Sequence, residues 1–283
     1  MSIPPFLAPP EGVTARTVPT ALGPCAVLDN EVLVRQLQGS ALLVPGFTGS
    51  KEDFIAVLAP LADRGIRALA LDLAGQFESP VASGSELSLA SFAAAVVEIA
   101  GSLPRPMALV GHSFGGLVVR EAVLSDPRAA EGLVFIASGP AAIPARQQQV
   151  LQKLVQVMDG FGLEAVWQGK RAMDAAAGLP IPAPEIDEFL TRRFFANDPT
   201  SLTAMVDALC SAADLTDKLA AIAPRSLVII GELDDVWPLE EQRHMASRLG
   251  ATVVSLPAVG HSPAVEAPEE VANAIAALLT DNE

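Results

Sequence analysis

The sequence is poor in basic residues. Among 283 residues, 18 are Lys or Arg and 33 are Asp or Glu, which gives a formal net charge of −15 at pH 7. Nucleic acids and anionic membrane surfaces bind proteins through basic patches, so this balance argues against both as partners. Hydrophobic residues make up 51% of the chain and charged residues only 18%, a composition that excludes a disordered protein.

Long hydrophobic runs are missing as well. No window approaches the roughly 18–20 uninterrupted apolar residues that a membrane-spanning helix needs. Long charge-free stretches such as residues 106–119 and 132–145 are interrupted by Gly, Pro, His or Ser and are typical of buried strands that run into loops. Residues 1–10 form a proline-rich tail without the basic region and apolar core of a signal peptide. We therefore expect a cytoplasmic protein with no membrane contact.

Cysteine and histidine are scarce. Cys25 and Cys210 lie far apart and have no companion ligands at metal-site spacing. We expect two reduced, buried thiols, with neither a structural disulfide nor a metal site. The chain has three histidines, His112, His244 and His261, so few residues can serve as a catalytic base near neutral pH.

Short apolar runs alternate with amphipathic stretches through much of the chain. The apolar runs predict buried strands at residues 41–45, 66–72, 107–111, 132–137, 226–231 and 251–256. The amphipathic stretches predict helices at residues 54–62, 87–103, 117–124 and 268–279. This alternation indicates an α/β protein with a mostly parallel, doubly wound sheet and helices on both faces.

The alternation is interrupted between residues 138 and 224. This segment has no convincing strand pattern but several helical ones, and Asp198-Pro199 is typical of a helix start. We therefore expect a core domain of residues 1–137 and 225–283 that carries a helical insertion at residues 138–224.

Residues 111–115, Gly-His-Ser-Phe-Gly, match the G-x-S-x-G pattern of a nucleophile elbow. The pattern needs glycine two positions either side of the serine because the strained strand-to-helix turn leaves no room for neighbouring Cβ atoms. Here it follows a predicted strand and opens a predicted helix, which is the context that the mechanism requires. The motif predicts Ser113 as a nucleophile.

A serine hydroxyl needs an adjacent base, and the base needs an acid. We expect His112 to be structural and His244 to lie on a helix surface. His261 follows the last predicted strand, where doubly wound sheets place their sites. Asp234 and Asp235 follow the strand before it, and either can be the acid, with Glu232 as a third candidate. The order serine, aspartate, histidine is that of the α/β-hydrolase fold.

With these motifs, the chain resembles the α/β-hydrolase superfamily from about residue 14 to residue 279. The acid-loop pattern G-x-x-D-x-x-x-P is matched by Gly231, Asp234 and Pro238, which favours Asp234 over Asp235. The resemblance implies that the helical insertion is a cap, or lid, on an α/β-hydrolase core. It also implies an oxyanion hole made by the backbone N–H groups of Phe47 and Phe114. Pro45 stands where relatives usually carry His, so the usual bracing of this loop is absent.

The predicted reaction is hydrolysis of a small carboxylic ester, thioester or lactone through an acyl-Ser113 intermediate, with no cofactor. The same triad can also serve C–C bond hydrolysis, amide hydrolysis, perhydrolase or haloperoxidase-like chemistry, or a lyase reaction. A non-catalytic receptor for a small ligand is a further alternative. The partner is then a small-molecule substrate, and the protein a monomer or homodimer.

Aromatic residues near the predicted site are candidates for substrate binding. Trp237 lies beside the acid loop, and Trp167 and Phe194 lie in the insertion, where packing between cap and core is the other interpretation. Arg192 and Arg193 can reach a substrate carboxylate or lie on a solvated helix face.

Overall fold

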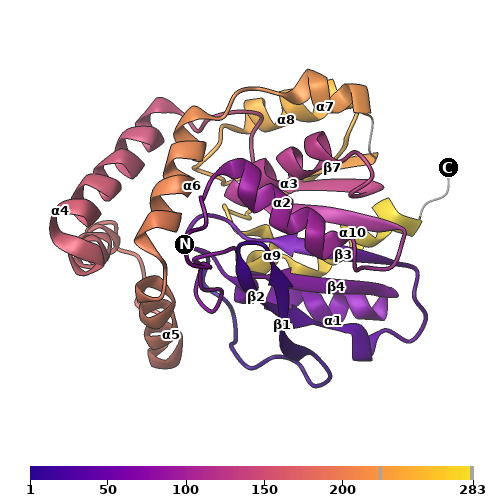
Figure 1. Cartoon of the computed structure of the whole chain (residues 1–283), viewed down its shortest axis with the longest axis horizontal. Coiled ribbons are helices and arrows are strands. Elements are labelled where there is room, and N and C mark those ends of the chain that lie inside the picture. The colour runs from indigo at the N-terminus through magenta and orange to yellow at the C-terminus, as the bar shows by residue number, and fades with distance from the viewer. Residues whose placement is uncertain (223–224, 281–283) are drawn as a thin grey trace.

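A single sheet forms the centre of the molecule (Figure 1). The computed structural model describes residues 1–222 and 225–280, and within these residues the sheet has eight strands in the order β1-β2-β4-β3-β5-β6-β7-β8. The pairs β1–β2 and β2–β4 are antiparallel, and the other pairs are parallel. The strands are β1 (Thr14–Thr20), β2 (Gly23–Asp29), β3 (Gly39–Val44), β4 (Ile66–Leu71), β5 (Met107–His112), β6 (Gly132–Ile136), β7 (Arg225–Gly231) and β8 (Thr252–Leu256).

Helices cover both faces of this sheet. One face is covered by α1 (Ile55–Asp63), α9 (Pro263–Glu266) and α10 (Pro268–Thr280). The other is covered by α2 (Leu89–Ala100), α3 (Phe114–Ser125), α7 (Thr216–Ile222) and α8 (Leu239–Leu249). Two short 3-10 helices, η1 (Glu31–Leu33) and η2 (Lys51–Phe54), lie in the loops after β2 and β3. The predicted doubly wound α/β architecture is confirmed.

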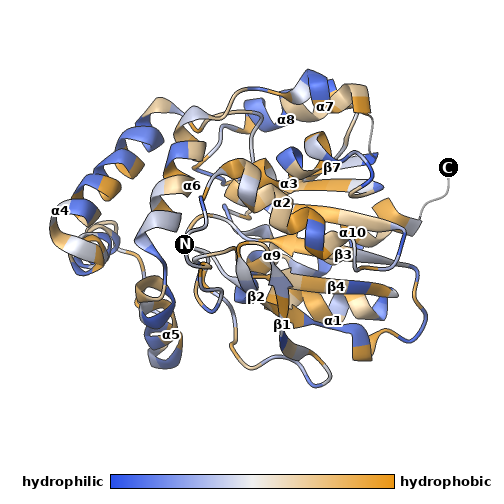
Figure 2. Cartoon of the chain, viewed as in Figure 1, coloured by the Kyte–Doolittle hydropathy of each residue, from blue (hydrophilic) through white to orange (hydrophobic). Residues whose placement is uncertain are grey.

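The central strands are apolar throughout because both of their faces are buried. In β3, Leu42 and Val44 contribute to the hydrophobic core on one side of the sheet, and Ala41 and Leu43 to the core on the other. All four side chains are fully buried. Figure 2 shows the same property as continuous hydrophobic colouring along the inner strands. A run of this kind is the signature of a parallel strand between two helical layers, and the six predicted strands are all present.

Two strands were not predicted, and helix α3 begins earlier than predicted. The antiparallel strands β1 and β2 have no predicted counterpart, because β1 is a largely exposed edge strand whose sequence, TARTVPT, lacks an apolar run and contains Pro19. Proline is tolerated at a sheet edge and argues against a strand elsewhere. Helix α3 begins at Phe114 and not at residue 117, since the strained turn at Ser113 leads directly into it.

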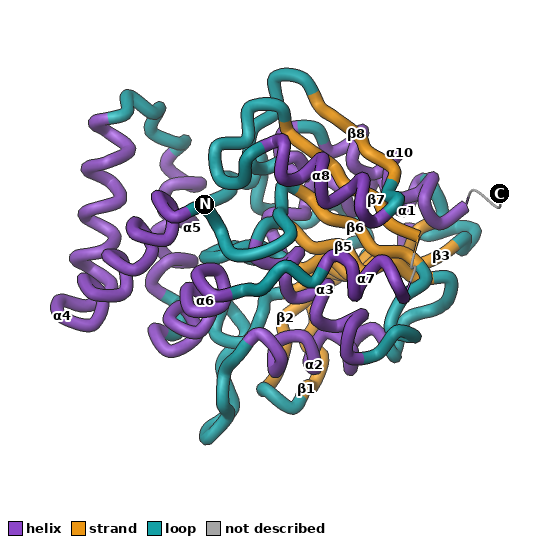
Figure 3. The backbone as a smooth tube through the Cα atoms, turned by 90° about the horizontal axis from the view of Figure 1, so that it is seen from above, coloured by secondary structure: helices purple, strands orange, loops and turns teal. Residues whose placement is uncertain are grey.

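The chain between β6 and β7 is helical in its described part. It forms α4 (Ala145–Ala176), α5 (Pro184–Phe195), α6 (Pro199–Ser211) and α7. Gly162, with a φ of 80°, breaks α4 into two helical segments. Helices α4, α5 and α6 lie beside the carboxyl ends of the strands, as Figures 1 and 3 show, and we call these three helices the cap. The predicted end of the insertion at residue 224 lies outside the described residues.

The cap has its own hydrophobic cluster. It is formed by Met158, Val166, Trp167, Ile186, Phe189, Leu190, Phe194 and Leu202, and Phe47 and Phe77 pack against it from the sheet domain. Helix α7, in contrast, contacts α3 and α8 and covers the sheet. In the part of the chain that the structure describes, no helix is both long and apolar enough to span a membrane.

Candidate active site

Ser113 occupies a strained turn between β5 and α3. Its φ of 53° and ψ of −117° lie in a region that residues other than glycine rarely adopt. The Ser113 N–H donates to the carbonyl of Ile136 (2.9 Å), and the Ser138 hydroxyl donates to the carbonyl of Ser113 (2.8 Å). The neighbouring strand β6 therefore holds the turn from one side.

Glycine is required on both sides of this turn. A Cβ atom at Gly111 would lie 2.3 Å from the carbonyl oxygen of Gly115, and one at Gly115 would lie 2.2 Å from the carbonyl oxygen of Val44. Both distances are too short for any side chain, since the contacts are to backbone atoms. The crowding that the motif predicts is present on each flank of Ser113.

Asp234 and His261 form a hydrogen-bonded pair. His261 Nδ1 and Asp234 Oδ1 are 2.8 Å apart. The Val236 N–H also donates to Asp234 Oδ1 (2.9 Å), and Gln242 Nε2 donates to Asp234 Oδ2 (2.8 Å). Burial opposes ionisation of this carboxyl, but the hydrogen bonds from His261 and the other donors outweigh it, so the pKa of Asp234 lies below its ordinary value. Asp235 is exposed, and the structure pairs His261 with Asp234.

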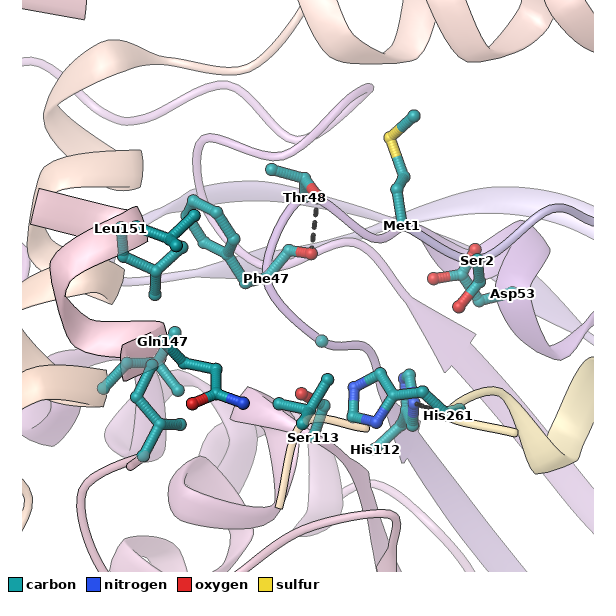
Figure 4. Close-up of a pocket in the computed structure, with 15 residues that line it drawn as sticks. Met1, Ser2, Phe47, Thr48, Asp53, His112, Ser113, Gln147, Leu151 and His261 are labelled. Atoms are coloured by element: carbon teal, nitrogen blue, oxygen red, sulfur yellow. Dashed lines mark hydrogen bonds between the residues drawn. The ribbon is translucent and has the colours of Figure 1, made fainter. Parts of the chain in front are cut away.

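Ser113 and His261 line one cavity of about 240 Å³ beneath the cap (Figure 4). Since His261 Nδ1 is bonded to Asp234, Nε2 is the ring nitrogen left for Ser113. Much of the rest of the lining is apolar. It comprises Met1, Ser2, Gly46, Phe47, Thr48, Asp53, His112, Ile143, Gln147, Val150, Leu151, Leu209 and Val236.

His112 connects the nucleophile elbow, residues 111–115, to the loop that carries His261. Its Nε2 lies 2.6 Å from the carbonyl oxygen of His261, and because a carbonyl can only accept, Nε2 carries the proton. Burial lowers the pKa of His112 to about 3, so the ring is neutral near pH 7. The expectation of a structural role agrees with these contacts. His244 lies exposed on α8.

The backbone amides of Phe47 and Phe114 are available as oxyanion donors. Within residues 1–222 and 225–280, neither N–H donates a hydrogen bond to the protein, and the Phe114 amide lies at the N-terminus of α3, where anions bind favourably. Phe47 belongs to residues 45–50, which we call the oxyanion loop because Phe47 is a predicted oxyanion donor. Gln76 Nε2 donates to the Gly46 carbonyl (2.8 Å), and the Thr48 hydroxyl donates to the Phe47 carbonyl (2.7 Å; Figure 4). These bonds brace the loop in which Pro45 replaces histidine.

The three aromatic residues predicted to contact substrate do not line this cavity. Trp237 is fully buried against Gly139, where a Cβ atom would lie 2.3 Å from the indole ring. Trp167 stacks on Phe194 inside the cap, with ring centroids 5.0 Å apart. The prediction is wrong for this cavity because large aromatic side chains gain most when their whole surface is buried, and here they complete two hydrophobic cores.

Neither predicted arginine lines the cavity. Arg192 is exposed on α5. Arg193 is fully buried and forms an ion pair with Asp53 across the boundary between cap and sheet domain. A buried arginine is recognisable only from its partner, and no spacing in the sequence connects these two residues.

Two further residues with roles at the site were not predicted. Gln242, fully buried on α8, donates a hydrogen bond to Asp234. Glu266 accepts hydrogen bonds from the Gly260 N–H (2.7 Å) and the Ser262 N–H (3.0 Å), on either side of His261. Both act from helices that follow the loops they hold, and a Gln or Glu on a helix gives no signal that separates this role from an ordinary surface position.

Metal ligation finds no support in the described part of the chain. There, no group of three or more His, Cys, Asp or Glu residues could hold a metal ion. Cys25 and Cys210 are free thiols. Cys25 is buried, and burial raises its pKa to about 12, while Cys210 is half-buried and not fully buried as expected.

Comparisons with known proteins agree with this fold. The family model described as "Alpha/beta hydrolase family" matches residues 41–274. A pimeloyl-[acyl-carrier protein] methyl ester esterase of Aeromonas hydrophila is 28% identical over 225 residues, which cover 76% of this chain and 85% of that protein. The protein of the same name from Shewanella sp. (strain MR-7) is 29% identical over 184 residues, 62% of this chain and 68% of that protein.

Solved structures match over nearly the whole chain. A thermophilic esterase from Thermogutta terrifontis has a TM-score of 0.74 at 22% identity, covering 93% of this chain and 96% of that chain. A hydrolase from Pseudomonas aeruginosa has a TM-score of 0.74 at 23% identity, covering 94% and 98%. These likenesses show a shared fold. With the family model matching most of the sequence, the chain is a hydrolase that belongs to the alpha/beta hydrolase family.

Proposed function

We propose that the protein is a serine esterase that hydrolyses small carboxylic esters through an acyl-Ser113 intermediate. One observation carries this proposal: His261, hydrogen-bonded to Asp234 at 2.8 Å, lines the same cavity as the strained Ser113. A nucleophile, a base and an acid that orients the base are the parts that acyl transfer by this route needs.

In the proposed reaction, Ser113 Oγ attacks the ester carbonyl carbon while His261 Nε2 takes the hydroxyl proton. Asp234 stabilises the resulting imidazolium and keeps the proton of Nδ1 in place. The Phe47 and Phe114 amides bind the oxyanion of the tetrahedral intermediate. The C–O bond to the alcohol then breaks as His261 returns the proton, and water hydrolyses the acyl-enzyme by the same steps.

The substrate that we propose is an ester of a small alcohol with an aliphatic acid. The cavity of about 240 Å³ is smaller than the roughly 300–1,000 Å³ of pockets for drug-sized ligands. Its apolar side chains come from α4, α6, the N-terminal segment and the loops after β3, β6 and β7, which favours an acyl group without charge. The two relatives described above are named as methyl ester esterases, which supports a small alcohol. Thioesters and lactones can undergo the same acyl transfer.

A panel of p-nitrophenyl and methyl esters with acyl chains of increasing length tests the proposal. It is combined with covalent labelling by a fluorophosphonate, using the Ser113→Ala variant as the unlabelled control. Ester turnover together with labelling of Ser113 supports the esterase. Labelling without turnover would indicate one of the other triad reactions, such as amide or C–C bond hydrolysis, and the absence of both would indicate a binding protein.

A further inference from the structure

Arg193 joins three parts of the chain at the edge of the catalytic cavity. From the cap helix α5, its Nη1 donates to Asp53 Oδ1 (2.6 Å) and to the Ser50 hydroxyl (3.3 Å), and its Nη2 donates to the carbonyl of Ser2 (2.7 Å). The guanidinium is fully buried and lies 5.2 Å from the centre of the Phe189 ring. A buried charge is energetically costly unless it is paired and hydrogen-bonded, so these contacts are what stabilise Arg193 at this position.

Asp53 connects Arg193 to the oxyanion loop. It lies in η2, directly after the loop, and its Oδ2 accepts a weak hydrogen bond from the Ser50 N–H (3.4 Å). The same oxygen closes the space beside Gly49, where a Cβ atom would lie 2.5 Å away. Burial raises the pKa of Asp53 and the guanidinium of Arg193 opposes that rise. The carboxylate thus relies on a cap residue for its charge and also supports the loop.

The loop itself is strained. Thr48 has a φ of 56°, a conformation that is rare for a β-branched residue. The peptide unit that it shares with Phe47 is held by its own hydroxyl, and the preceding carbonyl of Gly46 is held by Gln76. Strain of this kind persists only where the surroundings over-determine it. The Asp53–Arg193 pair is a polar support that comes from the cap, in addition to the packing of Phe47 against the cap cluster.

We propose that Arg193 is a positioning residue that, through Asp53, holds the oxyanion loop in the conformation that presents the Phe47 amide to the reacting carbonyl. Seating of α5 on the sheet domain and assembly of the oxyanion hole are then one event. The inference rests on the proposed esterase reaction, because its kinetic test measures ester turnover. A second test does not need turnover, because it measures the binding of an inhibitor that forms a tetrahedral adduct with Ser113.

The experiment compares Arg193→Met, Arg193→Lys, Asp53→Asn and the double variant R193M/D53N with wild type. A matched control is Arg171→Met, which breaks another Arg–Asp pair of the cap, that with Asp187, away from the cavity. Fluorophosphonate titration counts the competent serines, and kcat and KM are measured with p-nitrophenyl butyrate. The inhibition constant of an alkyl boronic acid is measured in parallel, because Ser113 Oγ adds to boron and a boron-bound oxygen then occupies the oxyanion site.

We expect R193M to lower kcat per titrated serine by about 10- to 100-fold, somewhat less than the full loss of an oxyanion donor, with KM nearly unchanged. The boronic acid inhibition constant should rise by a similar factor. D53N should act in the same direction, the double variant should be no worse than the poorer single variant, and R193K should recover part of the loss. R171M should match wild type.

A rise in KM with kcat unchanged would overturn the proposal. An unchanged boronic acid inhibition constant together with fewer titratable serines would also overturn it, because that pattern indicates a purely structural effect. If R193M does not fold, R193K and D53N give the same comparison. If the wild-type protein binds the boronic acid but does not hydrolyse esters, the proposed function is refuted. The inhibition constants of the variants would still decide the role of Arg193.

Discussion

Ser113 and His261 of the proposed triad line the same cavity as the oxyanion loop, but different interactions hold the triad and the loop. Ser113 follows β5, Asp234 follows β7 and His261 belongs to the loop after β8, so the ends of parallel strands bring all three to the same edge of the sheet. The oxyanion loop also follows a strand, β3, but its shape depends on side chains from other regions. One of them, Arg193, lies 140 positions from its partner Asp53.

The two halves of the site therefore differ in how far the sheet alone positions them. Strand ends are positioned by the backbone ladder and the two hydrophobic cores, so we expect the triad to depend less on the cap than the oxyanion loop does. The oxyanion loop depends on a buried ion pair that exists only when the cap is seated. Substitutions in the triad and in the oxyanion loop should therefore have different kinds of effect on activity and stability.

The largest expected effect is that of Ser113→Ala. Turnover of p-nitrophenyl esters should fall on the order of 10⁶-fold, as when the nucleophile of a Ser-His-Asp triad is removed, because the proposed acyl-enzyme forms on Ser113. The circular dichroism spectrum and thermal unfolding should be those of a folded protein. Residual turnover within a factor of ten of wild type would show that the chemistry lies elsewhere.

Asp234→Asn should come next, with a loss of about 10⁴-fold in kcat, because the amide favours the wrong tautomer of His261. Asp235→Asn is the matched control and should behave as wild type, since that side chain is exposed. Gln242→Leu, which removes one donor to Asp234, should cost about tenfold, near the 1.4 kcal/mol of one hydrogen bond. Equal losses in the two Asp variants would contradict the assignment of Asp234 as the triad acid.

The His112→Asn substitution tests the burial of the residue next to Ser113 through the pH dependence of protein stability. Burial lowers the pKa of His112 from 6.5 to about 3, so between these pH values the unfolded chain binds a proton that the folded chain does not. Stability is therefore lost as the pH falls through this window, by about 3 kcal/mol at pH 4. Asn keeps a donor but does not titrate, so the variant should lose correspondingly less stability between pH 7 and pH 4. Urea denaturation at both pH values measures this, and equal losses in the two proteins would count against it.

Trp167→Ala should have the smallest effect on catalysis. The indole stacks on Phe194 inside the cap and does not line the cavity, so its loss should cost about 3 kcal/mol of stability through the void that it leaves. The kcat per labelled serine should stay close to that of wild type. A large loss of kcat at full labelling would mean that packing inside the cap, and not only the Arg193 pair, controls the oxyanion loop.

Much of the sheet could be predicted from the sequence, because parallel strands between two helical layers are continuous apolar runs. The predicted triad followed from the same property: once the strands are placed, Ser113, Asp234 and His261 fall at strand ends in the order of a known fold. The strands β1 and β2 were not predicted, since β1 is exposed and carries no apolar run.

Contacts between distant polar residues could not be predicted. Nothing in the sequence distinguishes Arg193, fully buried on Asp53, from its exposed neighbour Arg192. Trp237 and Trp167 were expected near substrate because they lie beside the acid loop and in the insertion, but hydrophobicity alone does not separate a pocket wall from a core. These assignments require the arrangement of the cap on the sheet domain.

The burial of the two tryptophans has an optical consequence. The chain contains no tyrosine and two tryptophans, and one is buried in each of the two regions, Trp237 in the sheet domain and Trp167 in the cap. Ultraviolet emission therefore comes from one indole per region. In a Trp167→Phe variant the emission reports only on the packing beside the acid loop, and in a Trp237→Phe variant only on the interior of the cap. Loosening of the cap and unfolding of the sheet can thus be followed as two separate signals.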